Sequence, residues 1–151
     1  MRIVIVLCFF TFFLFSCQNE DICLEPGTPR IIMTFNDIDT LANKKEVPAL
    51  YVYPKDSLKG GRYNGVTTDS IAIDMELGPN ETSYTFETED MATNLKFSYI
   101  PENEYVSRAC GFKVTFKNLE VSNDYNSWIK NITVINDTIT DESKIALIIY
   151  H

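Results

Sequence analysis

Residues able to perform chemistry are few in this sequence, and they do not cluster. The single histidine, His151, is the last residue, and an imidazole that acts as a general base must be held by its neighbours. Because chain termini are seldom held in place, we do not expect His151 to be catalytic. Zinc sites need histidine and cysteine ligands at close spacing, and the sequence contains no such cluster. It therefore predicts neither an enzyme nor a bound metal or cofactor.

Acidic and aromatic side chains are plentiful, but no spacing selects a catalytic pair or a cation site. The acidic clusters at residues 37–39 and 87–90 lack the glycine-punctuated loop of a calcium site, and we expect them to be solvated loop charges. Tyr51 and Tyr53 alternate along one face, where two rings could stack on a sugar. The alternative role of these rings is packing in the core or at its rim.

The balance of charge argues against two classes of partner. The formal net charge is −8 at pH 7. Affinity for nucleic acid depends on Lys and Arg that neutralise phosphates, so no nucleic-acid partner is predicted. Docking on an anionic membrane through a basic patch is disfavoured for the same reason.

The N-terminus has the pattern of an export signal. Arg2 precedes an apolar run over residues 3–15 that only Thr11 interrupts, which is the layout of a signal peptide. A transmembrane helix takes roughly 20 residues, so this shorter run is not predicted to be one. Its end, Leu14-Phe15-Ser16-Cys17, resembles the lipobox of bacterial lipoproteins. That resemblance implies cleavage after residue 16 and lipidation of Cys17, with palmitate among the acyl chains that anchor the protein.

The number of cysteines agrees with this interpretation. Cys8 would leave with the signal, so that Cys17, Cys23 and Cys110 remain. If Cys17 is lipidated, Cys23 and Cys110 are left as one pair, in a compartment where disulfides persist. The alternative for these two residues is a pair of buried, inert thiols.

Alternating hydrophobicity begins at Pro29 and recurs along the rest of the chain. A period of two is typical of strands that bury one face. In the clearest such segment, Phe112, Val114 and Phe116 are expected to point inward. The final segment is apolar on both faces and is expected to be central. The predicted strands lie around residues 31–35, 71–74, 83–87, 95–99, 112–117, 128–136 and 145–150.

Turn-forming residues separate these segments at 59–61, 77–80, 101–103, 122–124 and 136–137. Only residues 37–45 and 89–93 could form a helical turn. Short strands with frequent turns predict an all-β fold, an antiparallel β-sandwich of immunoglobulin-like architecture with about seven to nine strands. The predicted organisation is a signal peptide over 1–16, a lipid anchor and tether over 17–28, and a β-sandwich domain over 29–151.

Five stretches together resemble a known family. Asp21-Ile22-Cys23, PRIIMTF from Pro29, SRACGFKVTF from Ser107, WIKNI from Trp128 and the closing Ile-Tyr-His are similar to an uncharacterised family of small Bacteroidota lipoproteins, a domain of unknown function. The resemblance covers nearly the whole chain after the signal. It implies a location in the cell envelope and a fold, but no mechanism.

Two further resemblances to proteins of that phylum concern export and modification. Gln18-Asn19-Glu20-Asp21 is similar to the acidic signal that sends lipoproteins to the cell surface. Four Asp-Ser/Thr-apolar triplets match the phylum's O-glycosylation motif, which implies glycans on exposed loops. Their hydroxyl residues are Thr40, Ser57, Ser70 and Thr138.

The sequence therefore predicts an outer-membrane lipoprotein, surface-exposed if the acidic signal is used, that contacts the membrane through its N-terminal lipid. We expect a non-enzymatic binding or structural module whose partner is another envelope protein. The alternative is an accessory protein that binds carbohydrate or cell wall through Tyr51 and Tyr53.

Overall fold

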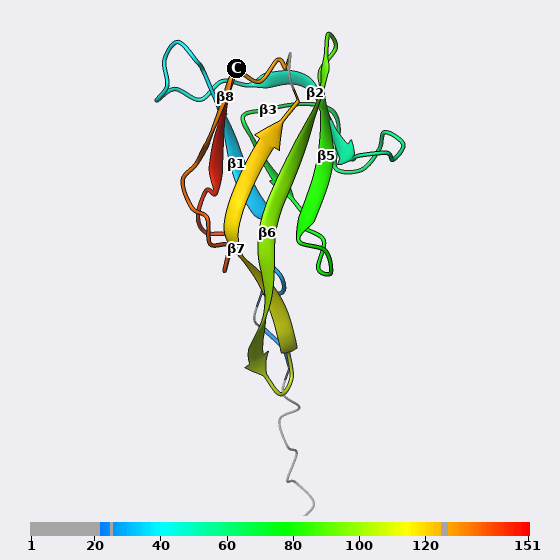
Figure 1. Cartoon of the computed structure of the whole chain (residues 1–151), viewed down its shortest axis with the longest axis vertical. Coiled ribbons are helices and arrows are strands. Elements are labelled where there is room, and N and C mark those ends of the chain that lie inside the picture. Colours follow the sequence, from blue (N-terminus) through cyan, green and yellow to red (C-terminus); the bar gives the residue numbers. More distant parts are fainter. Residues whose placement is uncertain (1–21, 25, 125–126) are drawn as a thin grey trace, which may run out of the picture.

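The computed structural model describes residues 22–24, 26–124 and 127–151, which form two β-sheets packed face to face (Figure 1). The predicted all-β sandwich is confirmed, and the described part contains nine strands. It contains no helix long and apolar enough to span a membrane. The strands are β1 (Ile31–Asn36), β2 (Val47–Pro54), β3 (Tyr63–Thr68), β4 (Ser70–Ile73), β5 (Glu81–Glu87), β6 (Ala92–Ser107), β7 (Gly111–Asn123), β8 (Asn131–Val134) and β9 (Leu147–Tyr150).

The two sheets contain strands from both halves of the chain. The four-stranded sheet has the order β4-β1-β9-β8, and the five-stranded sheet has the order β3-β2-β5-β6-β7. Neighbouring strands are antiparallel except β1 and β9, which pair in parallel from Met33 with Leu147 to Asn36 with Tyr150. β9 lies between β1 and β8, so the central position predicted from its two apolar faces is confirmed.

The hydrophobic core fills the space between the inner faces of the sheets. Phe35 from one sheet and Phe86, Phe97 and Phe116 from the other have no solvent-exposed surface. Fully burying a side chain of this size contributes roughly 1.5–3 kcal/mol. Burial of these side chains holds the two sheets together.

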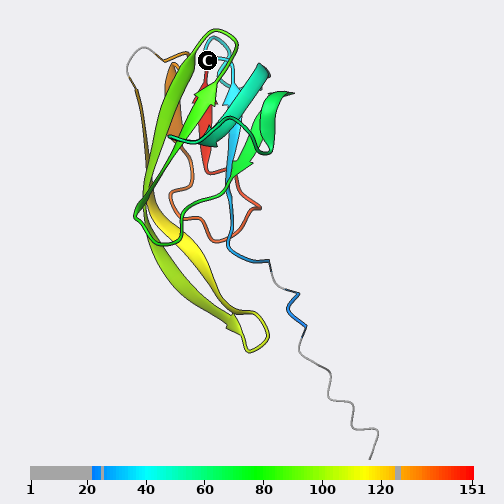
Figure 2. The same ribbon diagram turned by 90° about the vertical axis from the view of Figure 1, so that its right-hand side faces the viewer.

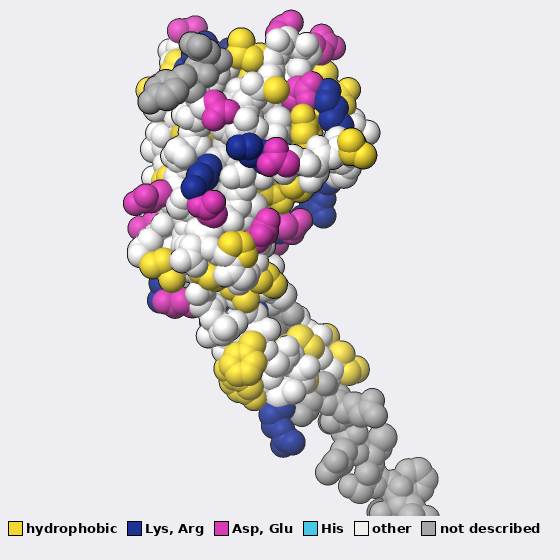
Figure 3. Space-filling view, turned by 45° about the vertical axis from the view of Figure 1, so that its right-hand side comes forward, with side chains coloured by type: hydrophobic (Ala, Val, Ile, Leu, Met, Phe, Trp, Pro, Cys, Tyr) yellow, Lys and Arg dark blue, Asp and Glu magenta, His cyan; other side chains and the backbone are white. Residues whose placement is uncertain are grey.

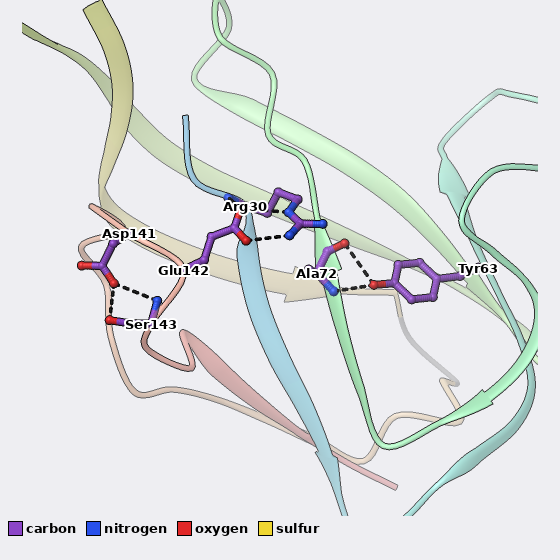
Figure 4. Close-up of polar contacts among 6 residues, drawn as sticks. All are labelled: Arg30, Tyr63, Ala72, Asp141, Glu142 and Ser143. Carbon is purple, nitrogen blue, oxygen red and sulfur yellow. Dashed lines mark hydrogen bonds and ion pairs between the residues drawn. The ribbon is translucent and has the colours of Figure 1, made fainter. Parts of the chain in front are cut away.

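One side of the sandwich is closed where β3 of one sheet leads directly into β4 of the other. The Tyr63 hydroxyl accepts a hydrogen bond of 2.7 Å from the Ala72 N–H and donates one of 3.2 Å to the Ala72 carbonyl (Figure 4). Both backbone groups of Ala72 are thereby satisfied by one side chain. The phenol therefore takes the place of a neighbouring strand along the outer edge of β4.

An ion pair holds the connection between β8 and β9 against the start of β1. Arg30 donates from Nε and Nη2 to the two carboxylate oxygens of Glu142, at 2.8 Å and 2.6 Å (Figure 4). The bidentate contact keeps the pKa of the Glu142 carboxyl below its ordinary value. In the same connection, Asp141 accepts hydrogen bonds from the N–H and the hydroxyl of Ser143.

The β6–β7 hairpin continues beyond the sandwich as a two-stranded projection (Figures 1 and 2). β6 pairs with β5 only from Ala92 to Ser98, whereas it pairs with β7 as far as Ser107. We call residues 101–115 the arm. Figure 2 shows that the arm and the N-terminal segment leave the body at the same end.

The turn predicted at residues 101–103 is wrong, because these residues continue β6 along the arm. Pro101 lies opposite Phe116, whose N–H and C=O both bond to Ile139 on the other side of β7. The N–H and C=O of Phe116 therefore point away from β6. In an antiparallel ladder, hydrogen-bonded pairs alternate with non-hydrogen-bonded pairs, and Pro101 and Phe116 form a pair of the second kind. The proline nitrogen therefore points to the open edge of β6, where no partner strand requires a donor.

Other differences from the sequence prediction have local causes. β2 was not among the predicted strands, because a bulge around Ala49, with φ at 47°, places Val47, Leu50 and Val52 inward and breaks the period of two. β3 was also missed, because its sequence, YNGVTT, has no apolar alternation. β8 is shorter than the predicted strand at 128–136. No helical turn forms at residues 37–45, which make bends and a turn, or at residues 89–93, where a bend leads into the start of β6.

Candidate functional site

A disulfide joins the N-terminal segment to the tip of the arm. Cys23 bonds to Cys110, with 4.8 Å between the two Cα atoms and a sequence separation of 87. Cys110 lies in the turn between β6 and β7, where its N–H donates to the Ser107 hydroxyl at 3.0 Å. The pairing predicted from the number of cysteines is therefore present, and the alternative of two buried thiols is wrong.

The segment after Cys23 follows the outer edge of β7 back to the body. The Thr28 hydroxyl accepts a hydrogen bond of 3.0 Å from the Val114 N–H, which points away from β6. An edge strand with exposed N–H groups can pair with other chains, and this contact covers one such group. The arm is thus held at its tip by the disulfide and along one side by residue 28.

An aromatic pair lies on the arm near the disulfide. Tyr105 and Phe112 are cross-strand partners, with ring centroids 5.4 Å apart and the rings nearly perpendicular. Tyr105 is 57 % exposed and Phe112 is 68 % exposed. The inward orientation predicted for Phe112 is wrong, because β7 extends past the opposing sheet, and among the described residues no core side chain covers the ring. Figure 3 shows hydrophobic side chains gathered on the arm, with a basic side chain at its tip.

The opposite end of the molecule holds His151. Its ring packs edge-on against Trp128 at 5.6 Å and Phe35 at 6.2 Å between centroids, and its Nε2 lies 3.3 Å from the Lys45 carbonyl. The expectation that this histidine lacks neighbours to hold it is therefore wrong. Burial lowers the pKa of His151 below its ordinary value. The described residues include no group of three His, Cys, Asp or Glu side chains that could hold a metal ion.

A shallow hollow of about 230 Å³ lies beside this histidine. Its lining includes both acidic and apolar side chains. The lining residues are Val47, Pro48, Thr88, Glu89, Asp90, Trp128 and His151.

The two tyrosines predicted to form a sugar-binding face lie together on the outer side of β2, and both contact charged neighbours. The Lys59 ammonium lies 5.1 Å from the Tyr51 ring centroid, and the Tyr53 hydroxyl donates to Glu87 at 2.8 Å. Lys59 also donates to Glu87 and keeps the pKa of that carboxyl below its ordinary value. Sugar binding at this face stays a prediction.

Gly65 allows the Tyr51 ring to approach β3 closely. A Cβ at residue 65 would lie 2.9 Å from the Tyr51 hydroxyl oxygen, and the residue has a φ of +73° that favours glycine. The glycine was visible in the sequence, but its partner ring became apparent only from the pairing of β2 with β3.

The four predicted O-glycosylation residues occupy different surroundings. Thr40 and Ser57 are exposed on loops, whereas Ser70 in β4 and Thr138 before β9 are partly buried. The hydroxyls of Thr40, Ser70 and Thr138 each donate to a nearby aspartate carboxylate. Modification of these residues stays a prediction, and Cys17 and the predicted signal peptide lie outside the described residues.

Fold and site together define a class of protein: a small all-β sandwich domain with a projecting hairpin that a disulfide ties to the N-terminal segment. The chain belongs to the family of unknown function DUF6452, whose pattern matches residues 46–151. No curated protein and no solved structure matches the chain.

Removing the disulfide should lower the free energy of unfolding. In Cys110→Ser, the crosslink across residues 23–110 is lost, and loop entropy in the unfolded chain predicts a loss of up to about 4–5 kcal/mol. Urea unfolding followed by circular dichroism measures the loss. Cys23→Ser and the double variant are the matched controls, and they should lose the same amount because all three remove one bond. Stability within about 0.5 kcal/mol of the wild type in all three would contradict the role of the crosslink.

His151 should make stability dependent on pH near neutrality. Its pKa in the folded chain is below the ordinary 6.5, so as pH falls through that value the unfolded chain takes up a proton first. The free energy of unfolding should therefore fall between about pH 7.5 and about pH 5.5. His151→Phe keeps the ring packing and should show a smaller decrease over the same range. Equal decreases in the two proteins would show that burial does not shift the pKa of His151.

Proposed function

We propose that the protein is a lipoprotein of the bacterial outer membrane, anchored through acyl chains on Cys17, and that it acts as a non-enzymatic binding or structural module. The signal-like run and the lipobox-like residues before Cys17 support the anchor. The family to which the chain belongs has no assigned activity, so the proposal concerns its location and its mode of action.

The disulfide is the observation that carries this proposal. Because Cys23 and Cys110 are bonded to each other and Cys8 would leave with the signal, Cys17 is the cysteine available for a lipid. Disulfides form and persist in the oxidising compartments outside the cytoplasm, which is where a lipoprotein is delivered. The bond also ties the sandwich to the chain close to the proposed anchor.

The arrangement of the domain suits a module that presents its far end to a partner. The arm and the N-terminal segment leave one end of the body, and the C-terminus lies at the other (Figure 1). The loop after β1 lies at that far end, since the Ile38 N–H donates to the His151 carbonyl. An anchor at the arm would leave these loops accessible from the side away from the membrane.

Substitution of Cys17 tests the anchor. Cells that express the full chain with Cys17→Ala should incorporate no labelled palmitate into this protein, and the protein should leave the membrane fraction. Cys8→Ala is the matched control, because it removes a cysteine of the predicted signal and should leave labelling unchanged. Labelling that persists in Cys17→Ala would overturn the proposal.

Crosslinking in intact cells tests the binding role. A photo-reactive residue in place of Leu41, which is exposed on the loop after β1, should capture one reproducible envelope protein. The same residue in place of Leu58, exposed on the loop between β2 and β3, serves as the control for position. If neither position captures anything beyond the monomer, the binding role is wrong.

A further inference from the structure

The tip of the arm carries an apolar surface. Ile22 and Leu24, on either side of the disulfide-bonded Cys23, are 76 % and 90 % exposed, and the Tyr105–Phe112 pair lies two strand positions from Cys110. We call these four residues the tip patch. Water-exposed side chains of this size, gathered at one end of a protein, mark a surface that contacts something apolar.

The chemistry of the tip patch matches the boundary between lipid headgroups and acyl chains. Tyrosine has an apolar ring and a polar hydroxyl, and it is enriched at membrane interfaces for that reason. Arg108, exposed in the turn beside the pair, can extend its guanidinium to headgroup phosphates while its stem stays among apolar groups.

Charge along the arm does not oppose the approach of the tip to a membrane. Glu102 pairs with Lys117 at 2.6 Å and Glu104 pairs with Lys113 at 3.7 Å. The charges of the arm itself cancel, because Glu102 and Glu104 are matched by Arg108 and Lys113, although the whole chain has a net charge of −8.

The length of chain before Cys23 places a lipid within reach of the tip patch. From residue 17 to residue 23 the chain has six steps, which span at most about 20 Å when fully extended. Cys23 is 4.8 Å from Cys110 between Cα atoms, and Phe112 follows two residues later, about 7 Å along the strand. An acyl anchor on Cys17 would thus confine the patch to the immediate neighbourhood of the membrane surface.

We propose that the tip patch docks into the interfacial layer of the membrane that holds the Cys17 lipid. This inference rests on the proposed function, because the reach of residues 17–23 supplies the membrane. Docking at the patch as well as at the lipid would give the domain two contacts with the bilayer and set the direction in which its far end points.

Fluorescence quenching by brominated lipids tests the docking. The lipidated full chain carrying Phe112→Trp is reconstituted into phosphatidylethanolamine–phosphatidylglycerol vesicles, with and without bromine on the acyl chains. The indole introduced by the substitution should lose most of its emission in the brominated vesicles. Leu41→Trp, at an exposed apolar position on the far-end loop, is the matched control and should keep its emission. The wild type, which has only Trp128 at the far end, corrects for the native signal.

The outcomes separate the inference from the function on which it rests. Mass spectrometry first shows whether Cys17 carries lipid, and a chain without it contradicts both proposals. Lipidated Phe112→Trp with equal emission in the two kinds of vesicle overturns the docking alone. An indole that is shielded from aqueous iodide but not quenched by bromine also overturns it, because a protein or a second copy then covers the patch. If Phe112→Trp fails to form the disulfide, Tyr105→Trp places the indole in the same aromatic pair, and its quenching by brominated lipid replaces the measurement.

Discussion

The pairing of β6 with β7 is the interaction on which the rest of the structure depends. Within the body, the two strands supply Leu95, Phe97, Tyr99 and Phe116 to the core, and all four are buried. β5 ends its contact at Ser98, and beyond the pair of Pro101 with Phe116 the same ladder continues without a second sheet to cover it. One continuous hairpin therefore both supplies side chains to the core of the sandwich and forms the projecting arm.

A two-stranded ribbon alone is marginally stable in water, so the arm needs further support. The disulfide supplies it at the tip, and the Thr28 hydroxyl supplies it along the edge of β7. Nearer the body, residues 137–139 bond to β7 through Phe116 and Leu119. Every one of these contacts joins the hairpin to a segment distant in sequence, so the arm's position is coupled to the fold of the whole domain.

Several features of the structure were predicted from local patterns in the sequence. The alternation around Ile31, Ile71 and Phe97 predicted strands with one buried face, and each of these side chains is in the core. The apolar character of residues 145–150 on both faces predicted a central strand, which β9 is. The number of cysteines predicted the pair Cys23 and Cys110. These predictions succeeded because each depends on periodicity or on chemistry that needs no knowledge of the partner strand.

Other features could not be predicted, because they depend on what lies opposite. Phe112 and Phe116 share one alternating pattern, yet one is 68 % exposed and the other is fully buried, since only Phe116 faces a second sheet. Pro101 indicates a turn in isolation and is tolerated in β6 because its nitrogen faces an open edge. The place of His151 against Trp128 and Phe35 likewise depends on the β1–β9 pairing, which brings the chain's last strand beside its first.

By itself, the sequence determined an acidic, all-β domain with strands at most of their observed positions and one pair of cysteines to join. It did so because a period of two and the chemistry of thiols are local properties. The tertiary structure alone decided which apolar side chains are covered and which stand exposed beside the disulfide. Burial depends on how far an opposing sheet extends, and that length is set by the pairing of strands far apart in the chain.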